Sequence, residues 1–149
     1  MATIRIENRQ KRQKISLPKM RRTAIRILNA LACPDAELSV VIVADEEIRD
    51  LNRDFLGRDR PTNVLSFPMR EGEASGLHPE LLGDVVISAD TAARDAAEAG
   101  GEFEKELCFL LLHGILHLVG FNHEEVSEEE IRRMEAKEDE IFALIAAES

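Results

Sequence analysis

Residues 102–119 constrain the fold more than any other stretch of the chain. They read EFEKELCFLLLHGILHLV, and their apolar side chains cover almost every face of a helix. A helix that is apolar all round must be covered on all sides by the rest of the protein. The sequence therefore predicts a helix that lies at the centre of the domain.

The remaining patterns predict short strands and amphipathic helices around this helix. Alternating or β-branched stretches predict strands at residues 3–7, 37–44, 63–69 and 84–88. Helical spacing predicts further helices from Leu17, over 46–56, over 89–99 and from Ser127. A chain of 149 residues is expected to form a single domain, over 1–149.

Local signals refine these elements. Pro68 confines its strand to an edge of the sheet or ends it. Asp45 is the expected N-cap of the second helix, and Ser127 with Glu130 forms an expected capping box at the last one. Residues 70–82 are rich in Gly, Pro, Ser and charge, and they are the best candidate for a mobile loop.

Charge is unevenly spread along the chain. The net charge of −10 argues against a protein that is basic all over. Residues 1–30 nevertheless hold nine Lys and Arg against one acid, whereas residues 101–149 hold thirteen acids against four bases. Two solvated faces are the simpler interpretation; alternatively, the basic segment 5–26 holds an anionic partner such as an RNA backbone.

The hydropathy of the chain predicts a cytoplasmic protein, and its two cysteines suggest neither a zinc site nor a redox motif. Cys33 and Cys108 are far apart and no CxxC pair is present, so two reduced, buried thiols are expected. No apolar run approaches the roughly 18 residues of a membrane span, and the first residues do not resemble a signal peptide. We therefore expect no contact with a membrane.

Three of the four histidines fall within the segment HGILHLVGFNH, residues 113–123. His113 and His117 are four residues apart, so on a helix both imidazoles point to the same side. Gly120 allows the chain to turn after the helix and to bring His123 to the same point. Three imidazoles around one ion leave a position open for water, as in catalytic zinc sites. The pattern predicts one zinc ion per chain, although other divalent transition metals suit the same ligands.

The same spacing, HxxxHxxGxxH, occurs in metzincin peptidases, whose first histidine is followed by a glutamate that acts as general base. Here that position is Gly114, which argues against ordinary zincin proteolysis. A metal lowers the pKa of its bound water and polarises a phosphoryl or carbonyl oxygen, so hydrolysis by metal-bound water is the favoured chemistry. Arg58 and Arg60, in the loop GRDRPT, are candidate contacts for a substrate phosphate, although solvated turn residues are the simpler interpretation.

Three segments together resemble the signatures of the bacterial YbeY endoribonucleases. They read LNRDFLGRDRPTNVLSFP (51–68), LGDVVIS (82–88) and HGILHLVGFNH (113–123). They occur in the order of the family and at its distances, and the similarity covers roughly residues 38–145.

This resemblance implies a metal-dependent, single-strand-specific endoribonuclease. Its expected roles are ribosomal RNA maturation, notably at the 3′ end of the small-subunit RNA, and ribosome quality control, with RNA and the small ribosomal subunit as partners. It also implies zinc held by His113, His117 and His123 in a cleft of a mixed sheet flanked by helices. We therefore expect an α+β fold with about four strands, about five helices, and a metal site on the central helix and the following turn.

The sequence departs from the family pattern at two positions. The family often has an arginine, implicated in activity, after the aromatic residue of the first signature, where Leu56 follows Phe55 here. Arg53 or Arg58 is a possible substitute for it. Before the third histidine, where the family tends to have aspartate, Asn122 is a neutral amide that cannot act as a base.

Two other functions stay open on the sequence alone. One is a metallopeptidase or other metallohydrolase that takes its base from elsewhere, such as Asp84 or Glu124. The other is a non-enzymatic ribosome-assembly factor whose metal stabilises the fold. The sequence identifies neither the general base, nor the cleavage site, nor the oligomeric state.

Overall fold

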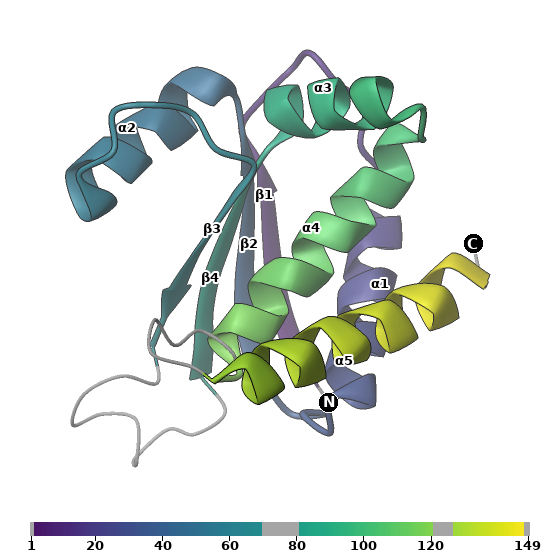
Figure 1. Cartoon of the computed structure of the whole chain (residues 1–149). Helices are drawn as coiled ribbons and strands as arrows, with labels where there is room; N and C mark the ends of the chain where they lie inside the picture. Colours follow the sequence, from purple (N-terminus) through teal and green to yellow (C-terminus); the bar gives the residue numbers. More distant parts are fainter. Residues whose placement is uncertain (1, 70–80, 121–126, 148–149) are drawn as a thin grey trace.

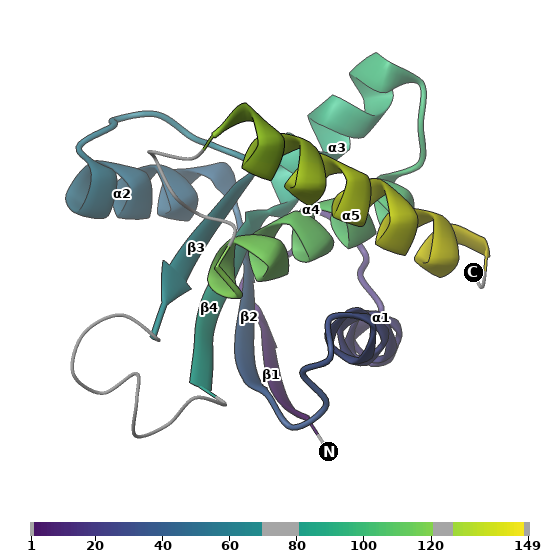
Figure 2. The ribbon, with the colours of Figure 1, turned by 60° about the horizontal axis from the view of Figure 1, so that its bottom comes forward.

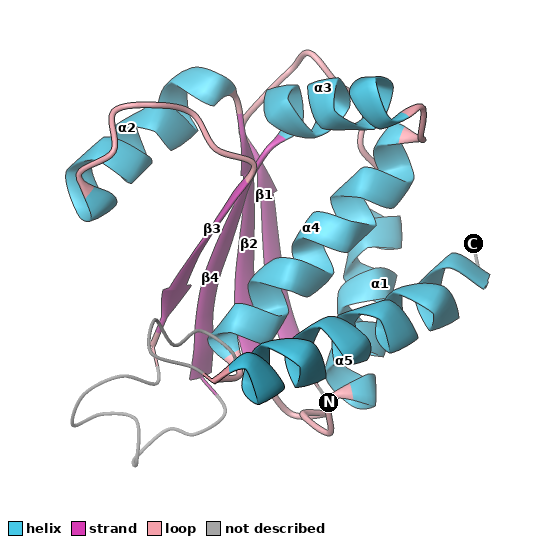
Figure 3. Cartoon of the chain, in the orientation of Figure 1, coloured by secondary structure: helices cyan, strands magenta, loops and turns pink. Residues whose placement is uncertain are grey.

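Four strands form one mixed sheet in this computed structural model, which describes residues 2–69, 81–120 and 127–147. In the order of the sheet they are β1 (Thr3–Asn8), β2 (Glu37–Val43), β4 (Leu81–Ser88) and β3 (Val64–Pro68). β1, β2 and β4 run parallel, and β3 pairs with β4 in the antiparallel direction (Figures 1 and 3). β2 is thus a central strand, and the strand that ends at Pro68 is an edge strand, as its proline predicts.

Five helices of the described chain flank the sheet. They are α1 (Leu17–Ala30), α2 (Asp45–Leu56), α3 (Ala89–Ala99), α4 (Phe103–Leu118) and α5 (Glu128–Ala147), with α5 packed on α4 and α1. The expected α+β fold, a small mixed sheet with flanking helices, is confirmed. None of the described helices is both long and apolar enough to cross a membrane.

Helix α4 lies at the centre of the packing, as its apolar sequence predicts. It contacts α1, α3 and α5 as well as strands β3 and β4, and Figure 2 shows α5 crossing over it. Eight of its residues are buried, among them Leu111, Ile115 and Leu116 with no exposed surface. Burial on this scale supplies much of the hydrophobic stabilisation of the main core.

The other face of the sheet carries a smaller core under α2. Ile42 belongs to the main core, whereas the next residue, Val43, packs with Ile48 of α2. Successive side chains of a strand point to opposite faces, so α2 and α4 lie on opposite sides of the sheet. β3, at the edge, is therefore reached from both layers.

The close approach of α4 to the sheet depends on Gly114. A Cβ atom here would lie 2.6 Å from Cγ1 of Val85 and 3.3 Å from Oγ of Ser66. The Ser66 hydroxyl donates instead to the carbonyl oxygen of Gly114, at 2.9 Å. Only a residue without a side chain lets α4 pack this closely on β4 and β3.

The predicted N-cap of α2 is wrong. Asp45 is the first residue of the helix, and its backbone N–H donates to Oδ2 of Asp90 on α3 at 2.9 Å. The Asp45 carboxylate accepts hydrogen bonds from three other side chains at 2.6–2.7 Å, those of Ser88, Thr91 and Arg94. Burial opposes the charge of Asp45, but these hydrogen bonds outweigh it and lower its pKa. The carboxylate joins two helices instead of capping its own.

The start of β4 is the second correction, because the strand begins at Leu81 and not at residue 84. Leu82 is an extra residue between the partners of Glu37 and Leu38, which makes a bulge. Gly83 follows it with a φ of +134°, and a Cβ there would lie 2.2 Å from the carbonyl oxygen of Phe67. Gly83 is thus part of a bulged strand that starts before the predicted one.

Of two further local predictions, the capping box at Ser127 is confirmed in part and the loop over 70–82 is mostly untested. The Ser127 hydroxyl accepts a hydrogen bond from the backbone N–H of Glu130 at 3.2 Å, which confirms that half of the predicted capping box. The predicted loop 70–82 lies mostly outside the described residues, which resume at Leu81.

Replacing Gly114 with alanine is expected to destabilise the protein. Val85 is fully buried and its β-branched side chain is stiff, so it cannot easily give way to the new methyl group. Overpacking of this kind costs about 1–3 kcal/mol and should outweigh the ~1 kcal/mol that alanine gains in a helix. Chemical denaturation measures the change. Gly101→Ala is the control, because its Cβ would meet nothing closer than Ala96 O at 3.9 Å; equal stability of the two variants would contradict the packing argument.

Candidate functional site

Two of the predicted ligands, His113 and His117, converge on the last turns of α4. Their Nε2 atoms lie 2.9 Å apart, and their ring centroids are separated by 4.5 Å. Two imidazole nitrogens that bind one tetrahedral zinc ion at 2.0–2.1 Å are roughly 3.3 Å apart. The pair therefore needs to open by only a few tenths of an ångström to hold one ion, so these residues fit a metal.

Helix α5 orients the first of these histidines. Oε2 of Glu138 lies 2.6 Å from Nδ1 of His113, and Glu138 is only 9% exposed. A carboxylate accepts hydrogen bonds, so this contact places the His113 proton on Nδ1 and leaves the Nε2 lone pair for a metal. Carboxylates in this position commonly orient metal-binding histidines.

Sequence reasoning missed Glu138, although a signal for it existed. Along α5, Glu138 precedes the buried residues Ile141 and Ile145 by three and seven positions, so it lies on the apolar face of the helix. An acid is almost never buried unless it has a partner. A glutamate in an apolar stripe is thus a reason to look for a cationic or hydrogen-bonding partner in the core.

A groove connects the histidines with the loop that follows α2. The groove has a volume of about 760 Å³ and runs along β3, with His113 and His117 on one wall. Arg58 and Arg60, the predicted phosphate contacts, line the same groove, and so do Leu56 and the aromatic residues Phe55 and Phe67. No Asp or Glu is present among the described residues that line it.

The loop that carries the two arginines is held in place by α2. Gly57 ends the helix in the left-handed conformation, with a φ of +72°. Asn52 is only 2% exposed, and its side-chain amide donates to the carbonyl oxygen of Arg60 at 2.9 Å. Arg49 binds both carboxylate oxygens of Asp59, at 2.8 and 3.3 Å, and this contact lowers the pKa of Asp59. No sequence pattern indicated that Asn52 fastens this loop.

The two proposed substitutes for the missing family arginine are separated by the structure. Arg58 lines the groove, whereas Arg53 does not. Arg53 pairs with Asp50 at 3.3 Å and with Asp54 at 3.1 Å, beside a different pocket. Of the two, only Arg58 has access to a ligand beside the histidines.

Several residues predicted for the site either do not line the groove or lie outside the part of the chain that the structure describes. Asp84 is adjacent to Val85, which faces α4, so Asp84 points to the other side of the sheet and does not line the groove. His123, Asn122 and Glu124 lie outside the described residues. Within the described ranges, no group of three or more His, Cys, Asp or Glu side chains is placed to hold a metal ion. The three-histidine site therefore stays a prediction.

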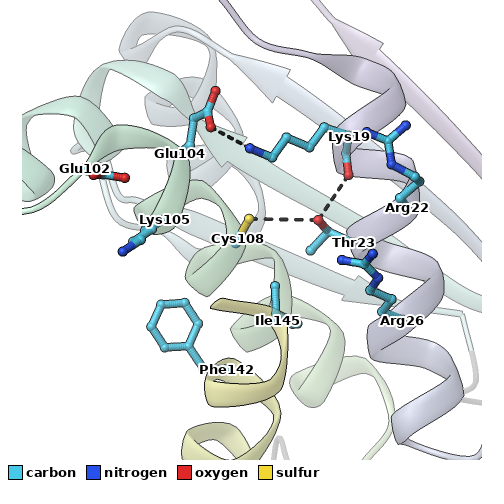
Figure 4. A pocket seen from close by; sticks show the side chains of 10 residues that line it. All are labelled: Lys19, Arg22, Thr23, Arg26, Glu102, Glu104, Lys105, Cys108, Phe142 and Ile145. Carbon is cyan, nitrogen blue, oxygen red and sulfur yellow. Dashed lines mark hydrogen bonds and ion pairs between the residues drawn. The ribbon is translucent and has the colours of Figure 1, made fainter. Parts of the chain in front are cut away.

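A second cavity, of about 400 Å³, lies between α1, α4 and α5 on another part of the surface (Figure 4). Lys19 on its rim bonds to Glu104 at 2.8 Å, and Thr23 lies 4.0 Å from the sulfur of Cys108. Burial raises the pKa of the Cys108 thiol. Neither Cys108 nor Cys33 forms a disulfide. The described lining of this cavity carries both acids and bases and contains no histidine, which separates the cavity from the candidate site.

The basic N-terminal segment also lies apart from the groove. α1 contacts β1, whereas the groove follows β3 at the opposite edge of the sheet. Within the segment, Arg9 pairs with Glu47 and Arg12 pairs with Asp90. An RNA contact through residues 5–26 stays a prediction, and it would be separate from the histidine groove.

Comparisons with known proteins agree on one family. The family model described as Endoribonuclease YbeY matches residues 5–146. Endoribonuclease YbeY of Syntrophotalea carbinolica is 64% identical over 148 residues, which cover 99% of each chain. The protein of the same name from Geobacter sulfurreducens is 61% identical over 142 residues, 95% of each chain. The solution structure of TM1509 from Thermotoga maritima superposes with a TM-score of 0.65 at 26% identity, covering 98% of this chain and 93% of that one.

Proposed function

The chain belongs to the endoribonuclease YbeY family, and from this premise we propose that it hydrolyses single-stranded RNA in the groove along β3, with a metal ion held by His113, His117 and His123. Ribosomal RNA is the proposed substrate, at the 3′ end of the small-subunit RNA, and the small ribosomal subunit is the proposed partner. The proposed place of action is the cytoplasm. The substrate and the partner rest on the resemblance of the three sequence signatures to those of the family, and the location rests on the hydropathy of the sequence.

One observation carries the assignment to this groove: its described lining joins two converging imidazoles to two arginines and contains no acid. The chain as a whole has a net charge of −10. A groove whose described lining carries arginines and no carboxylate, in so acidic a protein, suits a polyanion such as RNA. Its two arginines offer cationic contacts for a phosphodiester, and Asp84, one of the bases considered for a peptidase, is not among the residues that line it, so the geometry favours phosphodiester hydrolysis.

The residues in and behind the groove would have different roles in the reaction. A divalent metal, for which zinc is our first choice, would be held by His113, His117 and His123, and when bound it would supply Lewis-acid chemistry that polarises a phosphoryl group and acidifies water. Glu138 keeps the proton of His113 on Nδ1, so that Nε2 faces the groove as a lone pair. Arg58 and Arg60 hold substrate phosphates, for which the guanidinium group is well shaped.

Loss of His117 is expected to abolish RNA cleavage. In His117→Ala, one of two converging nitrogens is missing, and we expect the cleavage rate of a labelled single-stranded RNA to fall at least about 100-fold. Gel-resolved cleavage by purified wild type, His117→Ala and Lys105→Ala measures this; Lys105 is an exposed residue of the same helix. Circular dichroism confirms that each variant is folded. Equal cleavage by all three proteins would refute the proposal, and subunit binding that survives without any cleavage would favour an assembly factor.

Metal affinity should depend on Glu138. In Glu138→Gln the partner of His113 Nδ1 loses its charge, and loss of such a carboxylate typically weakens metal binding by about 10- to 100-fold. Competition for zinc with a chromophoric chelator measures the change. Glu135→Gln, an exposed position on the same helix, is the matched control and should bind as wild type does. Unchanged affinity in Glu138→Gln would show that the contact does not support a metal ligand.

The two groove arginines should contribute separately to RNA binding. Arg58→Ala and Arg60→Ala should each weaken binding and reduce the slope of log affinity against log salt by about 0.7, the value for one phosphate contact on a single strand. Fluorescence anisotropy at several salt concentrations gives the slope. Arg53→Ala removes the same charge from a nearby residue outside the groove. If its slope falls as much as that of Arg58→Ala, the effect is general electrostatics and not contact in the groove.

A further inference from the structure

Exposed apolar side chains lie in the groove and next to it in the chain. Phe55 is 66% exposed and Leu56 is 54% exposed, and both line the groove. Met69, which directly follows the groove residue Pro68, is 56% exposed. Exposed apolar patches beside a polar groove commonly mark a binding surface, because their contact with water is unfavourable.

The ring of Phe55 is exposed but braced. Its centroid lies 5.2 Å from that of Phe67, and the two rings are inclined at 62°, an edge-to-face arrangement. Phe55 extends from the last turn of α2, and Phe67 from β3, so two separate elements fix the pair. A ring held in this way loses little conformational freedom when a ligand stacks on it.

The position of this ring relative to the charged residues also matters. Arg58 and Arg60 follow Phe55 by three and five residues, and all three line the groove that contains His113 and His117. A nucleotide chain bound there would meet cationic groups for its phosphates and an apolar ring for a base within one groove. Grooves that bind single-stranded nucleic acids combine these two features.

We propose that Phe55, braced by Phe67, is a stacking platform for an unpaired base of the RNA substrate, an inference that rests on the proposed function. The ring selects single-stranded RNA, because in a duplex both faces of each base are already covered by its neighbours. Stacking on an aromatic side chain tolerates any base, since every base has a π face. The platform therefore distinguishes single strands from duplexes without reading sequence.

The composition of the chain permits a direct test, since it contains no Trp and no Tyr. Phe55→Trp introduces a single fluorophore at the proposed platform, and a His117→Ala background prevents cleavage during the measurement. Leu144→Trp, at a position on α5 that is 56% exposed and does not line the groove, is the matched control. Each protein is titrated with a single-stranded oligoribonucleotide, with a duplex of the same length, and with an abasic oligomer that keeps the phosphates.

Stacking predicts that the single strand quenches the indole fluorescence of Phe55→Trp saturably, that the duplex and the abasic oligomer quench it much less, and that the fluorescence of Leu144→Trp does not change. Anisotropy of labelled RNA is recorded in parallel to detect binding at any site. If RNA binds but the fluorescence of Phe55→Trp stays constant, or if the abasic oligomer quenches it equally, the stacking platform is refuted and RNA binding is not. If no RNA binds to any variant or to the wild type, the proposed function fails as well.

Steady-state kinetics with the full, metal-loaded protein give a second measurement that does not depend on the His117→Ala background. Phe55→Leu should raise KM for a short single-stranded RNA on the order of tenfold, whereas Phe55→Tyr, which keeps the ring, should stay near wild type. An equal rise of KM in both variants would indicate a packing role for Phe55 and overturn the proposal. Unchanged KM in Phe55→Leu would also overturn it.

Discussion

The contact between Gly114 and the sheet determines the arrangement of the candidate site. Because position 114 carries no side chain, α4 packs directly on Val85 and accepts a hydrogen bond from Ser66 of the edge strand. Residues of a helix are spaced by about 100° each, so turning residue 114 toward the sheet also fixes the directions of His113 and His117. One rotation of α4 thus places both imidazoles in the groove along β3 and brings His113 to Glu138 of α5. The glycine that argues against a zincin base in the sequence is a packing requirement in the structure.

Hydrophobic periodicity predicted every strand and helix that the structure describes, because each element buries one face or, for α4, nearly all faces. The errors occur where a residue distant in the sequence determines the local structure. Asp45 looks like a cap in its local sequence, yet its carboxylate bonds to side chains more than 40 residues away. The sequence predicts a strand from residue 84, yet β4 begins at Leu81 and bulges where Gly83 approaches the carbonyl of Phe67. Neither interaction has a signature within a short window of sequence.

The candidate site was predictable to the extent that it follows from the geometry of a single helix. His113 and His117 meet because residues four apart share a face, and no knowledge of the rest of the fold is needed for that. Glu138 and Asn52 could not be found in this way, since each acts on a residue brought to it by tertiary packing. Arg53 and Arg58 are both possible substitutes for the family arginine on the sequence; the structure places Arg58, in the loop after Gly57, in the groove and Arg53, on α2, outside it.

The charge of the whole chain is a poor guide to what the groove binds. The net charge of −10 repels RNA at long range, but at physiological ionic strength charges more than ~8 Å apart are largely screened. Many of the acids lie on α5, where Glu128 and Glu129 pair with arginines one turn further along the helix. The electrostatic potential at a bound phosphate is therefore set by the residues that line the groove. Among the described lining residues, the charged ones are Arg58 and Arg60. An acidic protein can accommodate RNA when, as here, the described lining of the groove contains no carboxylates.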